Sequence, residues 1–120
     1  MEYEMSALYD VTHGAGLAVI FPAWMKHVMK NAVDKFAQMA VRVWGCEMDF
    51  ENPEKTALEG IHRLENFLKS IGMTLTFEEI GAKESDIPHM VEKLMNGKDK
   101  VSSLVGLTAK DVEEIYRLAL

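Results

Sequence analysis

Apolar side chains recur every three or four residues through most of this chain, and that spacing constrains the fold more than any other feature. Residues 53–71 are the clearest case: Asn52 and Pro53 are typical of a helix start, and Gly72 of a stop. Residues 73–81 alone alternate like a strand, but they are too few to form a sheet and we expect an extended connector. The sequence therefore predicts an all-α fold. The apolar stripe of the 53–71 helix consists of Ala57, Leu58, Ile61, Leu64, Leu68 and Ile71.

The first third of the chain predicts two more helices. Apolar residues on most sides of residues 17–28 indicate a central, buried helix, and Pro22 places its start nearer Phe21 than Gly14. Residues 31–34 resemble a capping box that opens a second helix, and Gly45 is its expected stop. The stripe of the second helix is expected to be Val33, Phe36, Ala37, Ala40 and Trp44.

The last third predicts a further pair of helices. One starts at Ser85 or Asp86 and ends at Asn96–Gly97, and the other is capped by residues 108–111. With 120 residues and 48% hydrophobic content, the chain suffices for one core. We therefore expect residues 1–120 to form a single all-helical domain, an irregular bundle of about five helices. Its last helix should bury Val112, Ile115, Tyr116 and Ala119.

Charge and composition argue against several classes of partner and setting. The formal net charge is -6, with the acidic excess beyond Gly45, which argues against nucleic acid. The longest apolar run, residues 14–25, is shorter than the roughly 20 residues that a membrane span requires. Cys46 is the single cysteine, so no internal disulfide forms and we expect a cytoplasmic protein. Because the apolar run is short, we also expect no contact with a membrane.

The stretch His13-Gly14-Ala15-Gly16 permits several functional interpretations. A phosphate-binding glycine turn would need a third glycine and a preceding strand, and an esterase oxyanion turn would need a G-x-S-x-G elsewhere. A metal ligand suits an imidazole beside glycines, which leave room for a substrate or cofactor. On the residues alone, the pattern favours a structural histidine at a helix start.

The other histidines suggest weaker hypotheses. Glu59 with His62, and Asp86 with His89, have the acid-x-x-His spacing of di-metal bundles. That site would also need two further inward glutamates, which are not evident. His27 is expected on the surface near the end of its helix, where positive charge is favourable.

A longer stretch resembles a known family. Residues 2–16 and then 17–25 are similar to the metal-binding signature of iron-containing alcohol dehydrogenases, in particular to the NAD(P)H-dependent butanol dehydrogenase branch. The likeness continues through residues 36–38, 42–45, 67–72 and 111–118, so it covers essentially the whole chain.

The resemblance implies roles for two residues. In that family a dinucleotide-binding α/β domain precedes a helical domain, and a divalent metal, iron or sometimes zinc, is held between them by one aspartate and three histidines. His13 matches the last of these metal ligands, with Gly14 and Gly16 keeping the approach open. Tyr3 occupies a cofactor-binding position near the nicotinamide. The other three ligands and the cofactor domain correspond to sequence upstream of Met1, and no catalytic residue is assigned here.

The resemblance also implies a function for the complete enzyme. It would interconvert aldehydes and primary alcohols with NAD(P)H, the metal acting as a Lewis acid on the carbonyl oxygen. We expect this chain alone to be inactive and to bind neither metal nor NAD(P)H, because one imidazole cannot hold iron or zinc. Its expected partner is a separate dinucleotide-binding domain or a second copy.

A stand-alone helical interaction or self-association module is the alternative. In that case an exposed apolar face would be covered by another molecule of the same chain. The residues expected in this face are Met5, Leu8, Leu17 and Ile20.

Overall fold

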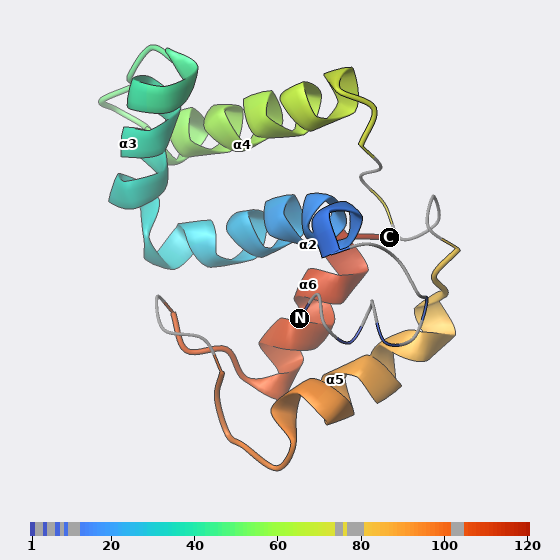
Figure 1. Cartoon of the computed structure of the whole chain (residues 1–120). Coiled ribbons are helices and arrows are strands. Elements are labelled where there is room, and N and C mark those ends of the chain that lie inside the picture. Colours follow the sequence, from blue (N-terminus) through green and yellow to red (C-terminus); the bar gives the residue numbers. More distant parts are fainter. Residues whose placement is uncertain are drawn as a thin grey trace.

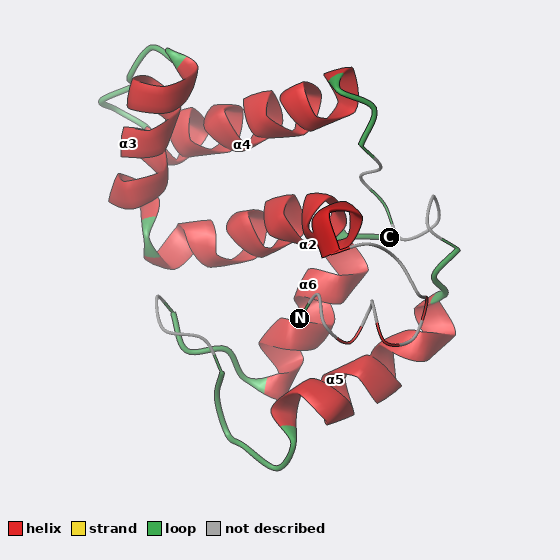
Figure 2. Cartoon of the chain, in the orientation of Figure 1, coloured by secondary structure: helices red, strands yellow, loops and turns green. Residues whose placement is uncertain are grey.

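The computed structural model describes residues 1, 4, 7, 9, 13–73, 76, 81–101 and 105–120. These residues form helices and loops (Figure 2), and their one β interaction is an isolated antiparallel bridge between Val101 and Leu107. No described helix is both long enough and apolar enough to cross a membrane. The all-α prediction is confirmed. The five described α-helices are α2 (His13–Val28), α3 (Val33–Trp44), α4 (Pro53–Ser70), α5 (Ile87–Met95) and α6 (Ala109–Leu118), with short 3-10 turns η1 (Met29–Asn31) and η3 (Glu84–Asp86).

Helix α2 lies at the centre of the arrangement. The pair α3 and α4 lies on one side of it, and α5 and α6 lie on the other (Figure 1). The core runs through all five of these helices, which bury their apolar faces against α2 or against each other. Its most fully buried large side chains include Val19, Val28, Ile61, Ile87, Met90 and Tyr116.

The start of α2 differs from the prediction. The helix begins at His13 rather than near Phe21, and Pro22 lies inside it. An internal proline removes one backbone hydrogen bond and costs about 3 kcal/mol in an isolated helix. Here Pro22 is itself buried, and packing of α2 on both sides offsets the cost. The prediction of a central, largely buried helix is confirmed.

The caps of α3 are only partly as expected. Its N-cap is Ala32, which has no side-chain cap, and Asn31 belongs to η1, so the predicted capping box is wrong. Gly45 does end the helix, with φ of 67°, and its N–H donates to the Ala40 carbonyl. The left-handed conformation there is one that glycine adopts without steric cost.

Helix α4 begins at Pro53, as predicted, but its N-terminal loop is held differently. Asn52 makes no side-chain cap, and the Asp49 carboxylate instead accepts from the backbone N–H groups of Glu51 and Asn52 at 3.1 and 3.0 Å. The apolar stripe predicted for this helix is one residue too long, because Ile71 lies beyond the end of α4 and is 57% exposed.

Helices α3 and α4 come close together at two small residues, Gly60 and Ala40. A Cβ placed on Gly60 would lie 2.5 Å from the Ala40 Cβ and 2.9 Å from the Ala40 Cα. Only glycine permits this spacing. The pair forms the most extensive helix–helix contact among the described elements.

The last two helices agree with the prediction. Asn96 ends α5 in the left-handed conformation, with φ of 44°. Thr108 and Asp111 form a reciprocal capping box at the start of α6, where two unpaired backbone N–H groups find partners. All four residues predicted to face inward from α6 are buried.

Two described residues near the N-terminus, Met1 and Tyr9, contact the C-terminal half of the chain. The Tyr9 hydroxyl donates to the Asp86 carboxylate, and the Tyr116 hydroxyl donates to the Met1 carbonyl at 2.8 Å. Burial, and then the Asp86 bond, raise the pKa of Tyr9 to about 12. The predicted connector at 73–81 lies mostly outside the described residues.

Candidate functional site

His13 is the first residue of α2, and its side chain is exposed. Among the described residues, no atom outside its chain neighbours and its own helix backbone lies within 4 Å of the position that a Cβ on Gly14 would occupy. Gly16, by contrast, is buried. The start of α2 thus places the His13 side chain at the surface of the described part of the protein.

An apolar groove of about 360 Å³ begins beside Gly14 and runs between α2, α3 and α4. Two of its side chains are strongly exposed for apolar residues, Phe21 at 43% and Val43 at 66%. A contiguous exposed apolar surface of this kind marks a site for another protein segment or a ligand. Its lining includes Leu17, Phe21, Met39, Val43, Leu64 and Leu68.

Trp44 forms part of the groove wall. Its ring packs against that of Phe67, with centroids 5.8 Å apart. Its indole N–H is buried and has no acceptor within the described part of the chain. A buried donor that lacks a hydrogen-bond acceptor lowers the free energy of unfolding by about 1–3 kcal/mol.

The overall shape is flatter than that of a compact domain. The chain measures 41 × 34 × 19 Å, and its radius of gyration is 14.7 Å. A compact domain of this length would have a radius of gyration of about 13.6 Å. The helices therefore form a flat arrangement about two helix diameters thick.

The apolar face predicted from sequence has a different membership. Ile20 is only 5% exposed and belongs to the core, because the buried side of α2 includes the positions around Val19 and Ala23. Leu17 is half-buried in the groove. Met5 and Leu8 lie outside the described residues, as does Tyr3, whose cofactor-binding role stays a prediction.

One group of side chains with metal-binding chemistry occurs in the described part of the chain, and it does not include His13. It consists of His27, Asp111 and Glu114, which bring ligand atoms within 4.8 Å of one another. His62 and His89 are exposed and belong to no such group. Within the described residues, His13 therefore offers a single donor, and a lone imidazole does not hold iron or zinc.

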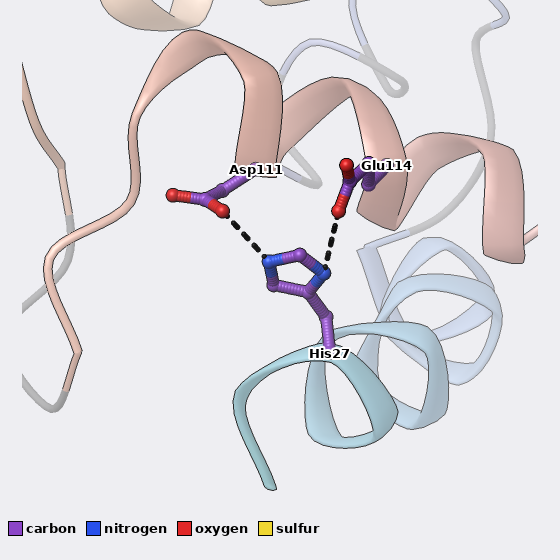
Figure 3. A group of neighbouring side chains, drawn as sticks. All are labelled: His27, Asp111 and Glu114. Atoms are coloured by element: carbon purple, nitrogen blue, oxygen red, sulfur yellow. Dashed lines mark hydrogen bonds and ion pairs between the residues drawn. The ribbon is translucent and has the colours of Figure 1, made fainter. Parts of the chain in front are cut away.

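His27 was predicted as a surface residue, but it lies between helices. Its imidazole contacts Asp111, which is 84 positions away in the sequence (Figure 3). The available sequence signal was the pair of acids at 111 and 114, which share one face of a helix. Nothing in the sequence placed that face against the end of α2.

The carboxyl group of Asp111 is held in its charged form. The backbone N–H of Thr108 donates to it at 2.9 Å, and this bond, followed by the Thr108 hydroxyl and His27, lowers the pKa of Asp111.

Comparison with known proteins relates the chain to a group of bacterial dehydrogenases. It is 33% identical over 119 residues to the NADH-dependent butanol dehydrogenase A of Clostridium acetobutylicum, covering 98% of this chain and 30% of that protein. It is 32% identical to the probable NADH-dependent butanol dehydrogenase 1 of Bacillus subtilis, covering 100% of this chain and 31% of that protein. The chain thus spans just under a third of the length of these relatives.

A solved structure gives the same result. The crystal structure of the NADH-dependent butanol dehydrogenase A of Thermotoga maritima superposes with a TM-score of 0.88 and 35% identity, over 98% of this chain and 31% of that one. The family model described as "Fe-containing alcohol dehydrogenase family, C-terminal" matches residues 1–120. This chain therefore belongs to the Fe-containing alcohol dehydrogenase family and corresponds to its C-terminal, helical part.

Proposed function

We propose that this chain supplies one metal ligand, His13, to an iron-containing, NAD(P)H-dependent alcohol dehydrogenase that interconverts aldehydes and primary alcohols. The observation that carries the proposal is the exposed imidazole at the first position of α2, with open space at Gly14 beside it. When bound, the metal supplies Lewis-acid polarisation of the carbonyl oxygen. The part of this chain is to hold the imidazole at a fixed helix start.

The remaining ligands and the dinucleotide site come from a segment that this chain does not contain. Its relatives are about three times as long, which supports such a segment. The apolar groove between α2, α3 and α4 is its docking surface, since it begins beside Gly14 and so brings an occupant to the His13 end of α2. Alone, the chain is inactive, and it binds neither the catalytic metal at His13 nor NAD(P)H. Its buried, unpaired Cys46 suits the cytoplasm.

Co-expression tests the proposal. The chain is produced with the portion of a butanol dehydrogenase that it does not match, and the purified product is assayed for retained iron and for NADH-dependent reduction of butanal. We expect a stable complex with both properties. His13→Ala should remove the iron and the activity but leave the complex intact, because the docking surface is unchanged. His89→Ala, at another exposed helical histidine, is the matched control.

Two results would contradict the proposal. One is a complex whose iron content and activity survive His13→Ala. The other is a complex that forms equally well with Phe21→Asp, which places a charge in the groove. Tyr3 is proposed to lie beside the nicotinamide, and Tyr3→Phe should then raise the KM for NADH without changing iron content.

The alternative is a self-association module, and the exposure of Phe21 and Val43 favours it. In that case the groove is covered by a second copy of the chain. Sedimentation of the purified chain would show a dimer, and Val43→Lys would convert it to a monomer. A monomer at all concentrations would exclude this function.

A further inference from the structure

The end of α2 and the first half of α6 bring three potential metal ligands together. The His27 Nε2 lies 3.0 Å from the Asp111 Oδ1, and the His27 Nδ1 lies 3.5 Å from the Glu114 Oε2. Figure 3 shows the imidazole of α2 pointing between the two carboxylates of α6. The exposed fractions of the three side chains are 17%, 32% and 49% in that order, so solvent reaches the cluster from the Glu114 side.

The donor set is that of a borderline divalent cation. One imidazole nitrogen and two carboxylate oxygens suit zinc, cobalt or manganese, whereas calcium and magnesium prefer oxygen alone. A tetrahedral zinc ion with ligands at about 2.1 Å holds its donors about 3.4 Å apart. The three ligand atoms lie within 4.8 Å of one another, so the widest separation must shorten by about 1.4 Å to reach that spacing. Asp111 and Glu114 contact opposite nitrogens of the ring, so Glu114 must also turn toward the Asp111 side.

The capping box of α6 fixes one of these ligands in advance. The Asp111 Oδ2 accepts from the backbone N–H and the hydroxyl of Thr108, both at 2.9 Å. The other oxygen, Oδ1, is directed to His27. Such outer hydrogen bonds orient a ligating carboxylate, as they do in established metal sites.

The second carboxylate is placed by helix geometry. Asp111 and Glu114 are three positions apart on α6, which puts them on one face. Glu114 is long and half-exposed, so it can rotate from the Nδ1 side of the ring to share a cation with Asp111. Two helices thus supply the three donors, one from α2 and two from α6.

The surroundings provide space and do not cancel the negative charge. A hollow of about 630 Å³ adjoins the cluster, enough for an ion and its waters. Of the basic residues that line it, Lys26 pairs with Glu65 at 3.0 Å, and Arg117 pairs with Glu84 and Glu113. Lys30 is exposed. Two of the three basic residues beside the cluster are thus paired with other carboxylates.

We propose that His27, Asp111 and Glu114 bind a divalent cation of the zinc and cobalt class, with water completing its coordination. The cation ties the last turn of α2 to the first half of α6. The site does not depend on the proposed function, because His13 is at the other end of α2, fourteen residues and about 21 Å away along the helix.

Calorimetric titration of the chain with zinc chloride at neutral pH tests this site, and cobalt absorption spectra report the ligand geometry. We expect one saturable zinc site and a zinc-dependent rise in Tm. His27→Gln should weaken binding at least about tenfold, because it removes the only nitrogen donor. Glu114→Gln should also weaken it and is the safer variant for folding, since this side chain is half-exposed.

Two variants at other histidines are the controls. His89→Ala and His13→Ala should each change zinc affinity less than about twofold, because neither residue belongs to the cluster. The proposal is overturned if no saturable zinc binding occurs. It is equally overturned if His27→Gln and Glu114→Gln both bind zinc like the parent chain, or if His13→Ala abolishes the binding instead.

Discussion

The contact between α3 and α4 at Gly60 can be tested by adding a single methyl group. Gly60→Ala would put a Cβ 2.5 Å from the Ala40 Cβ and 2.9 Å from the Ala40 Cα. Carbon atoms in good contact are about 3.5–4.0 Å apart, so the two helices must separate by about 1 Å. Since one of the clashing atoms is backbone, no rotamer change relieves the contact.

The size of the stability change expected for Gly60→Ala follows from two opposing effects. Alanine is the better helix former by about 1 kcal/mol, which favours the variant. Overpacking a close contact costs about 1–3 kcal/mol, and separating the helices also loses dispersion energy over the most extensive contact between described helices. We expect a net loss of about 1–2 kcal/mol in the free energy of unfolding. In a domain of this size that lowers Tm by about 4–8 °C.

Urea denaturation followed by far-UV circular dichroism measures the effect. Gly14→Ala is the matched control, because the added methyl meets no described atom within 4 Å beyond its own helix backbone and chain neighbours. It should be neutral or stabilising by up to about 1 kcal/mol. The double variant Ala40→Gly/Gly60→Ala removes the Cβ–Cβ clash but not the contact with the Ala40 Cα. It should therefore recover part of the loss, with a coupling energy of at least about 0.5 kcal/mol.

The reasoning is refuted if Gly60→Ala raises the free energy of unfolding by about 1 kcal/mol. That result would mean that helix propensity alone sets the stability of the variant, and that α3 and α4 move apart without a loss of packing energy.

Three further predictions concern other positions. Thr108→Ala removes the α6 cap and should cost about 1 kcal/mol in urea unfolding, whereas Thr108→Ser, which keeps the hydroxyl, should cost much less. The pKa of Tyr9 rises from 10.0 to about 12 on folding, so protonated Tyr9 contributes fully to the free energy of unfolding below pH 10, and this contribution is lost as pH rises to 12. Tyr9→Phe should therefore make the free energy of unfolding less dependent on pH between pH 10 and 12. An unchanged pH dependence in that variant would speak against the Tyr9–Asp86 bond. His13→Ala should change thermal stability by less than about 0.5 kcal/mol, and a loss above about 2 kcal/mol would show a structural histidine.

The family resemblance directed attention to His13, and the structure describes its surroundings. An exposed ring beside an unfilled Gly14 is compatible with a ligand, whereas a ring packed among apolar side chains would not be. Tyr3 lies outside the described residues, so its role depends on the resemblance alone.

The sequence alone determined which segments are helices and where most of them end. Those signals are local: an apolar side chain every three or four residues, a left-handed stop at Gly45 and a capping box at Thr108 each act within one or two turns. Where local signals conflicted, the prediction was wrong. Pro22 favoured a start nearer Phe21, but the helix begins at His13, because packing on both sides of α2 outweighs the cost of an internal proline.

Only the tertiary structure decided what meets across the chain. The contact of His27 with Asp111 spans 84 positions, and the approach of Gly60 to Ala40 depends on how two helices cross. The open groove likewise depends on which side of α2 is buried. A repeat along one helix shows that it has an apolar side, but which neighbour covers that side is set by the packing of all the helices together.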